Sequence, residues 1–258
     1  MKTQLLILVA GLISFNAQAA IKAETVLYKE GNVSLEGYIA YDDSVKKERP
    51  GIVIVHDWMG PSAFTEGRAK ELAKLGYVAF AADIYGKGVR PANAEEAGKL
   101  AGHFKGDRGL LRARTKAAMD QLLSTKLVDS KKVVVMGYCF GGTAALELAR
   151  SGAPLAGTAS FHGGLSTPNA SDAKNIHGKV LVMHGAIDPY VPQAEVIAFK
   201  EEMSKARVDW KFISYANAVH AFAVPGAGND PSKGAAYNAA ADKKSWADFQ
   251  KFLNDLFK

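Results

Sequence analysis

Cys139 is the only cysteine in the chain, and it lies in the sequence GYCFGG at residues 137–142. An apolar run over 133–136 precedes it, and a stretch of small residues over 142–149 favours a helix after it. This strand–turn–helix pattern is the nucleophile elbow G-x-S-x-G with sulfur in place of oxygen. The apex residue of such a turn is strained, and glycines beside it let strand and helix approach closely. The pattern therefore predicts a nucleophilic thiol rather than a structural cysteine.

Two further reactive residues follow later apolar runs. Asp188 lies in HGAIDP at 184–189, and His220 lies in VHAF at 219–222. The chain order nucleophile, acid, histidine is that of an α/β-hydrolase triad. His220 can take the thiol proton and later protonate the leaving group, while Asp188 can hold the required imidazole tautomer. Taken separately, Asp188 could simply cap a helix and His220 could be structural, but their order after the elbow favours a triad.

Acyl transfer also needs hydrogen-bond donors for the developing oxyanion. The backbone N–H of Phe140, directly after the nucleophile, is one expected donor. The second expected donor is the backbone N–H of Trp58, in the turn that follows the apolar run 51–55. Asp57 precedes Trp58 in the same turn and is a candidate for contact with the resting thiol or the substrate.

Other polar residues at the ends of apolar runs are expected to stabilise the fold rather than to react. We expect His162 and His184 to be hydrogen-bonded turn residues, and Asp83 to support the loop that follows it. The six histidines and one cysteine show no metal-ligand spacing, and the glycines of the elbow lack the Gly-Lys-Ser/Thr of a phosphate loop. We therefore expect neither a metal nor a cofactor.

The elements that must position these residues alternate along the chain. Short apolar runs predict strands, and helical patterns of 10–15 residues separate them, which indicates a mostly parallel sheet with helices on both faces. Two strands at 25–28 and 33–41 form an expected antiparallel hairpin around the turn KEGN. The expected strands are 51–55, 77–82, 133–136, 156–161, 179–184 and 210–215; the expected helices are 64–75, 91–104, 109–123, 192–206 and 242–257.

The first nineteen residues read as a secretory signal peptide. Lys2 begins it, an apolar stretch over 5–15 follows, and Ala17-Gln18-Ala19 is a small-residue cleavage signal. We expect cleavage after Ala19 or Ala20, a periplasmic or secreted location, and no membrane attachment of the mature chain. Residues 20–258 then form a single α/β domain, and a lone cysteine outside the cytoplasm cannot form an internal disulfide.

Composition excludes other classes of function. The chain has a net charge of +6, but its basic residues are scattered and do not alternate with aromatic residues, so no nucleic-acid partner is expected. The expected partner is a small-molecule ester, lactone or thioester, and the expected oligomeric state is a monomer.

From about residue 25 to 257, the chain resembles the dienelactone hydrolase family. The matching residues are the GYCFGG elbow, Asp188 in HGAIDPYVP, His220 in VHAF, and DIYG at 83–86. The resemblance implies an α/β-hydrolase fold, a Cys139–His220–Asp188 triad, ester or lactone hydrolysis through a thioester, and no cofactor.

The chain departs from the family pattern in two ways. The enzyme that names the family has a glutamate at the position matched here by Asp57, and an arginine shortly after the triad histidine. No arginine follows His220 at that place, so Arg108 or Arg112 is the candidate to bind a substrate carboxylate.

Two other classes carry part of the same pattern. Proteins of the glutamine-amidotransferase type also have a cysteine elbow, but they lack the acid-bearing strand end between nucleophile and histidine. A non-enzymatic binding protein could retain the fold, although the intact triad residues argue for an enzyme. The favoured interpretation is therefore an exported hydrolase that attacks through Cys139.

Overall fold

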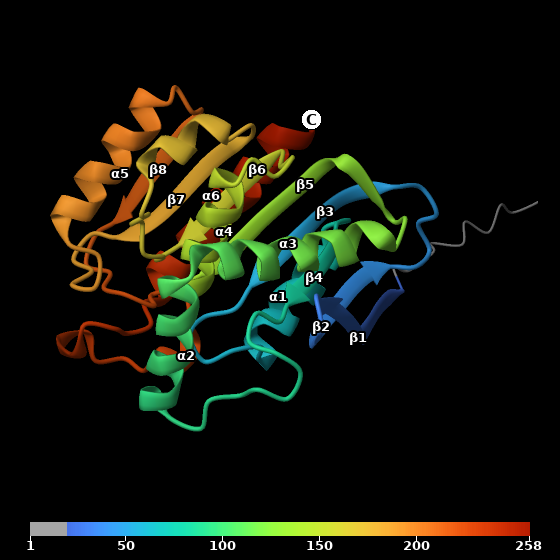
Figure 1. The fold of residues 1–258 in the computed structure, drawn as a ribbon, viewed down its shortest axis with the longest axis horizontal. Helices are drawn as coiled ribbons and strands as arrows, with labels where there is room; N and C mark the ends of the chain where they lie inside the picture. Colours follow the sequence, from blue (N-terminus) through green and yellow to red (C-terminus); the bar gives the residue numbers. More distant parts are fainter. Residues whose placement is uncertain (1–19) are drawn as a thin grey trace, which may run out of the picture.

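The computed structural model describes residues 20–258, and the expected signal peptide at 1–19 lies outside the described residues. The chain forms one eight-stranded sheet with strand order β1-β2-β4-β3-β5-β6-β7-β8 (Figure 1). The strands are β1 Ile21–Glu30, β2 Val33–Asp42, β3 Arg49–Val55, β4 Val78–Ala82, β5 Val128–Tyr138, β6 Gly157–Phe161, β7 Lys179–Gly185 and β8 Trp210–Tyr215. The helices are α1 Ala63–Lys74, α2 Ala94–Gly106, α3 Arg108–Ser124, α4 Phe140–Arg150, α5 Gln193–Lys205 and α6 Ala239–Phe257, with short 3₁₀ turns η1 Ala170–Asn175, η2 Pro225–Ala227 and η3 Pro231–Lys233.

The strands from β3 onward pair with one another in parallel. At one edge of the sheet, β1 pairs antiparallel with β2, and β2 pairs antiparallel with β4. The predicted mostly parallel sheet with an N-terminal hairpin is confirmed. The hairpin strands are longer than the apolar pattern indicates, because β1 lies at an edge and keeps pairing through polar residues. Likewise β5 begins at Val128, five residues before its apolar run, because buried Val128 pairs with Arg49; the register then shifts, and pairing with β3 resumes at Val133 opposite Gly51.

The helices cover the two faces of the sheet. On one face, α2, α3 and α4 pack over alternate residues of the central strands, such as Val53, Val55 and Val135. On the other face, α1 and α6 pack over the residues between them, such as Ile54 and Met136. Helix α5 covers the far end of the sheet beside α4 (Figure 1). A sheet covered on both faces explains why its central strands are continuously apolar.

The parallel strands all end at the same edge of the sheet. The loops after β3, β5, β6, β7 and β8 therefore meet there, and they carry Trp58, Cys139, His162, Asp188 and His220 respectively. Strand β5 lies between β3 on one side and β6 followed by β7 on the other, so Cys139 occupies the middle of this group.

Candidate active site

Cys139 occupies the sharp turn between β5 and α4. Its backbone has φ +53° and ψ −113°, a conformation that residues with a side chain rarely adopt. The turn is held because the Cys139 N–H donates to the Phe161 carbonyl at 3.0 Å, and the Cys139 carbonyl accepts from the Gly142 N–H at 3.0 Å. A side chain at Gly141 would collide with the backbone carbonyls of β3, so glycine is required for this close approach.

The side chains of Cys139, His220 and Asp188 form one hydrogen-bonded chain. Nε2 of His220 lies 3.0 Å from Sγ of Cys139, and Nδ1 of His220 lies 2.8 Å from Oδ2 of Asp188. The second oxygen of Asp188 accepts from the Tyr190 backbone N–H at 2.8 Å, which fixes the carboxylate plane. Nδ1 therefore carries the proton shared with Asp188, and Nε2 faces the thiol.

The surroundings of His220 favour its protonated form. Burial alone lowers the pKa of His220, but the hydrogen bonds to Asp188 and Cys139 and the charges of these two groups outweigh burial and raise the pKa to about 10. An imidazolium beside Sγ favours the thiolate electrostatically, and the thiolate is the nucleophilic form of cysteine. Cys139 is also the N-cap residue of α4, where the helix dipole favours a negative charge.

The turn after β3 is held by His56, which sequence reasoning did not single out. Nε2 of the fully buried His56 accepts from the Ile84 N–H at 3.1 Å, so Nδ1 carries the proton and donates to the Asp57 carbonyl at 2.6 Å. Burial lowers the pKa of His56 to about 4, so the ring stays neutral in this tautomer. The Tyr85 hydroxyl donates to the Trp58 carbonyl at 2.8 Å, which is a further hydrogen bond to the same turn.

The two expected oxyanion donors lie on these two turns. Phe140 is the first residue of α4, so its N–H has no acceptor within the helix. Trp58 lies on the turn from β3, the strand paired directly with β5. The side chain of Asp57 accepts from the Met59 N–H at 2.8 Å, and burial raises its pKa against the effects of that hydrogen bond and of His220. Asp57 therefore lies close enough to the triad to interact with His220.

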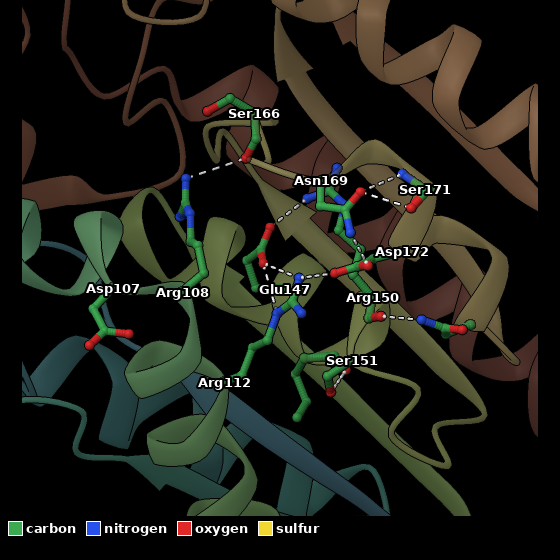
Figure 2. A network of polar contacts seen from close by, with 12 residues as sticks. Asp107, Arg108, Arg112, Glu147, Arg150, Ser151, Ser166, Asn169, Ser171 and Asp172 are labelled. Carbon is green, nitrogen blue, oxygen red and sulfur yellow. Dashed lines mark hydrogen bonds and ion pairs between the residues drawn. The ribbon is translucent and has the colours of Figure 1, made fainter.

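The two candidate arginines lie in a separate network on α3 and α4 (Figure 2). Arg112 forms ion pairs with Glu147 at 2.7 Å and with Asp172 at 2.8 Å. Arg108 points to the loop after β6, where its Nη2 lies 3.4 Å from the Ser166 carbonyl. Among the described contacts neither side chain bonds to a triad residue, so the structure does not bring these arginines to the thiol.

The expectation for His162 and His184 is wrong in part. Both side chains are buried, but neither ring nitrogen of His162, nor Nδ1 of His184, has a hydrogen-bond partner within residues 20–258. The His162 ring instead packs edge-on against His220, with centroids 5.3 Å apart, and burial holds the pKa of His162 well below its ordinary value. The sequence placed both histidines at strand ends correctly but could not reveal what their rings contact.

The expectation for Asp83 is confirmed. Its carboxylate is fully buried and accepts from the backbone N–H groups of Glu36, Tyr85 and Gly86, each at 3.0 Å. These bonds tie the loop after β4 to the N-terminal hairpin. Asp83 thus supports the loop that carries Tyr85, and through it the turn at Trp58.

A second residue that sequence reasoning missed is Tyr190. Its ring packs edge-on against His220, with centroids 5.4 Å apart and planes 84° apart, and its hydroxyl donates to the Lys233 carbonyl at 3.1 Å. Its position two residues after Asp188 was the available signal.

Within residues 20–258, no cluster of three or more His, Cys, Asp or Glu side chains could hold a metal ion, and no helix has the length and apolar character to cross a bilayer.

Comparisons with known proteins identify the fold and the family. The family model of the dienelactone hydrolase family matches residues 35–257. A dienelactone hydrolase-like promiscuous phosphotriesterase from metagenomic libraries is 38% identical, covers 93% of this chain and 100% of its own, and superposes with a TM-score of 0.88. A solved structure named m3DLH is 37% identical over 93% of this chain and all of its own, with a TM-score of 0.89. The protein usf of Aquifex pyrophilus is 31% identical over 77% of this chain and 86% of its own. The match over nearly all described residues, together with the fold, shows that this chain is a hydrolase of the α/β-hydrolase fold and belongs to the dienelactone hydrolase family.

Proposed function

We propose that this protein is an exported hydrolase that cleaves an ester, lactone or thioester through a covalent thioester on Cys139. The observation that carries the proposal is the continuous hydrogen-bonded chain from Sγ through His220 to Asp188, at 3.0 Å and 2.8 Å. Thiolate, general acid–base and orienting carboxylate are the three groups that cysteine-based acyl transfer requires.

The geometry supports the following sequence of steps. The Cys139 thiolate attacks the acyl carbon, and the N–H groups of Phe140 and Trp58 donate to the resulting oxyanion. Nε2 of His220 gives its proton to the leaving oxygen or sulfur, which leaves an acyl thioester on Cys139. His220, now neutral, takes a proton from water, and the hydroxide attacks the thioester. The carboxylic acid leaves, and the thiolate–imidazolium pair is restored.

The test is to trap the acyl intermediate. Intact-mass spectrometry after mixing with a p-nitrophenyl ester should show one acyl group, and peptide mapping should place it on Cys139. A Cys139→Ala variant should remain unacylated and should show no burst of p-nitrophenol. Hydrolysis should be measured with a set of short esters, lactones and thioesters. This set should include a neutral aryl phosphotriester, because the similar solved structure is named a promiscuous phosphotriesterase. A burst that persists in Cys139→Ala would contradict the nucleophile, and no hydrolysis of any substrate would favour a binding protein.

The raised pKa of His220 predicts an unusual pH profile for thiol alkylation. Because the pKa of His220 is raised to about 10, an imidazolium is expected 3.0 Å from Sγ throughout the neutral range. The rate of alkylation of Cys139 by iodoacetamide should therefore be nearly constant from about pH 6 to 8, whereas an ordinary thiol slows about tenfold per unit below its pKa of about 8.5.

The control for this measurement is His220→Gln, which keeps a polar side chain but removes the imidazolium. Its alkylation rate should rise with pH as that of free cysteine does. A wild-type rate that follows the free-cysteine profile at every pH would refute the thiolate–imidazolium pair.

Export and a monomeric state belong to the same proposal. The small-residue cleavage signal at 17–19 supports export, and mass spectrometry of the mature protein isolated from the periplasm or medium would test it by locating the first residue. The glutamine-amidotransferase alternative loses its support, since the family match spans the strand end that carries Asp188.

A further inference from the structure

Four apolar side chains remain exposed on the two loops beside the thiol. Trp58 and Met59 are 38% and 39% exposed, and Ile187 and Tyr190 are 58% and 60% exposed. Large apolar side chains are normally scattered on a surface, and a group gathered around a reactive centre indicates a binding site. These four residues are called the rim below.

The topology places the rim on both sides of Cys139. Trp58 and Met59 follow β3, which pairs with β5 on one side, while Ile187 and Tyr190 flank Asp188 after β7 on the other side. The Tyr190 ring contacts His220 directly, with its centroid 5.4 Å from that of the imidazole. Because the Tyr190 hydroxyl is held by the Lys233 carbonyl, the ring is fixed in this position. One member of the rim is therefore in direct contact with a group that reacts.

Two arginines of this region already have polar partners. Arg112 is paired with Glu147 and Asp172. The guanidinium of Arg90, near the turn after β3, donates to the Val89 carbonyl at 2.8 Å and lies 3.9 Å from Glu36.

The charge that does lie at the rim is negative. Asp57 precedes Trp58 and Met59 in the same turn, and its carboxylate accepts from the Met59 N–H at 2.8 Å. A substrate carboxylate bound beside this turn would meet a like charge.

We propose that the rim binds the apolar acyl or alcohol group of a neutral ester, and that Asp57 disfavours substrates that carry a carboxylate. This inference rests on the proposed function, because it names the substrate class of the same thiol. Trp58, Met59, Ile187 and Tyr190 supply apolar contact area, and Asp57 supplies discrimination against anions. Specificity is then a difference between attraction of one class and repulsion of the other.

The experiment compares two p-nitrophenyl esters whose acyl chains have similar length but different charge, the neutral pentanoate and the anionic monoglutarate. We expect kcat/KM of the wild-type enzyme to be at least about 30-fold higher for the pentanoate. Asp57→Asn should raise kcat/KM for the monoglutarate relative to the pentanoate. Equal kcat/KM for the two esters, or a preference for the monoglutarate, would overturn the inference.

A matched pair of variants tests the rim itself. Ile187→Ala should lower kcat/KM for p-nitrophenyl pentanoate about tenfold. The same variant should change kcat/KM for p-nitrophenyl acetate little, because only the longer acyl chain reaches the rim. Leu27→Ala is the control, since Leu27 is equally exposed at 58% but lies on β1. Equal effects of the two variants on the pentanoate would also overturn the inference. Failure of the proposed function is separate, because Cys139 would then not be acylated by either ester.

Discussion

Replacing Asp188 with asparagine is expected to lower kcat for an activated ester by about 10⁴ at neutral pH, the order found when the orienting carboxylate of a triad becomes an amide. The physical reason lies in the second oxygen of Asp188. The Tyr190 N–H donates to Oδ1 at 2.8 Å, so an asparagine would keep its carbonyl there and turn its NH₂ toward Nδ1 of His220. Nδ1 would then have to accept, and the proton would move to Nε2. The ring would point an N–H at Sγ and could not take a proton from the thiol or from water.

The control is Asp120→Asn, which changes an exposed carboxylate on α3 that pairs with Lys116. Steady-state kinetics of both variants should be accompanied by denaturant unfolding, so that loss of activity is separated from loss of fold. Asp188→Asn should unfold cooperatively near the wild-type midpoint while its kcat falls. Retention of kcat within tenfold of wild type would show that Asp188 does not orient His220 during turnover.

Replacing Arg150 with methionine is expected to lower the free energy of unfolding by about 3–5 kcal/mol, because one partner of a buried ion pair is removed. Arg150 is fully buried and donates to both oxygens of Glu202, at 2.8 Å and 2.7 Å. It also donates to Glu147 at 3.1 Å (Figure 2) and to the Leu165 carbonyl at 2.9 Å. Glu147 keeps Arg112 as a partner, whereas Glu202 loses its ion-pair partner. The variant should therefore destabilise the contact between α4 and α5.

Two further variants interpret this result. Arg150→Met combined with Glu202→Leu removes both charges and should recover a large part of the lost stability. Lys116→Met breaks an exposed pair with Asp120 and should change the free energy of unfolding by no more than about 0.5 kcal/mol. The measurement is urea unfolding followed by circular dichroism. Equal effects of Arg150→Met and Lys116→Met would refute the assignment of a stabilising role to the buried network.

The sequence predicts the sheet well because its signals are local. The apolar residues before Cys139 suffice to predict a buried strand. The glycines of the elbow indicate that backbone segments approach closely there, and in the structure Gly141 lies against the backbone of β3. The order of Asp188 and His220 places them after strands that turn out to be neighbours in the same sheet.

Side-chain pairing between distant segments is what the sequence could not provide. Arg112 appeared free to meet a substrate, but its partner Glu147 lies 35 residues away and is recognised only once α3 and α4 pack together. His162 appeared to be a hydrogen-bonded turn residue, but its ring packs against His220 and Phe222 in the loop after β8. Tyr190 carried no chemical motif, and its contact with His220 depends on the packing of the loops after β7 and β8.

The separation of the triad along the chain has a consequence for when the thiol becomes reactive. The contact between Cys139 and His220 spans 81 residues, and that between Asp188 and His220 spans 32. Until β8 and the following loop have docked, the chain carries an ordinary cysteine with no imidazolium beside it. Activation of the thiol therefore requires the complete sheet, and an unfolded chain would react only as a free cysteine does. Recovery of burst activity on refolding should accordingly lag behind the recovery of helical circular dichroism.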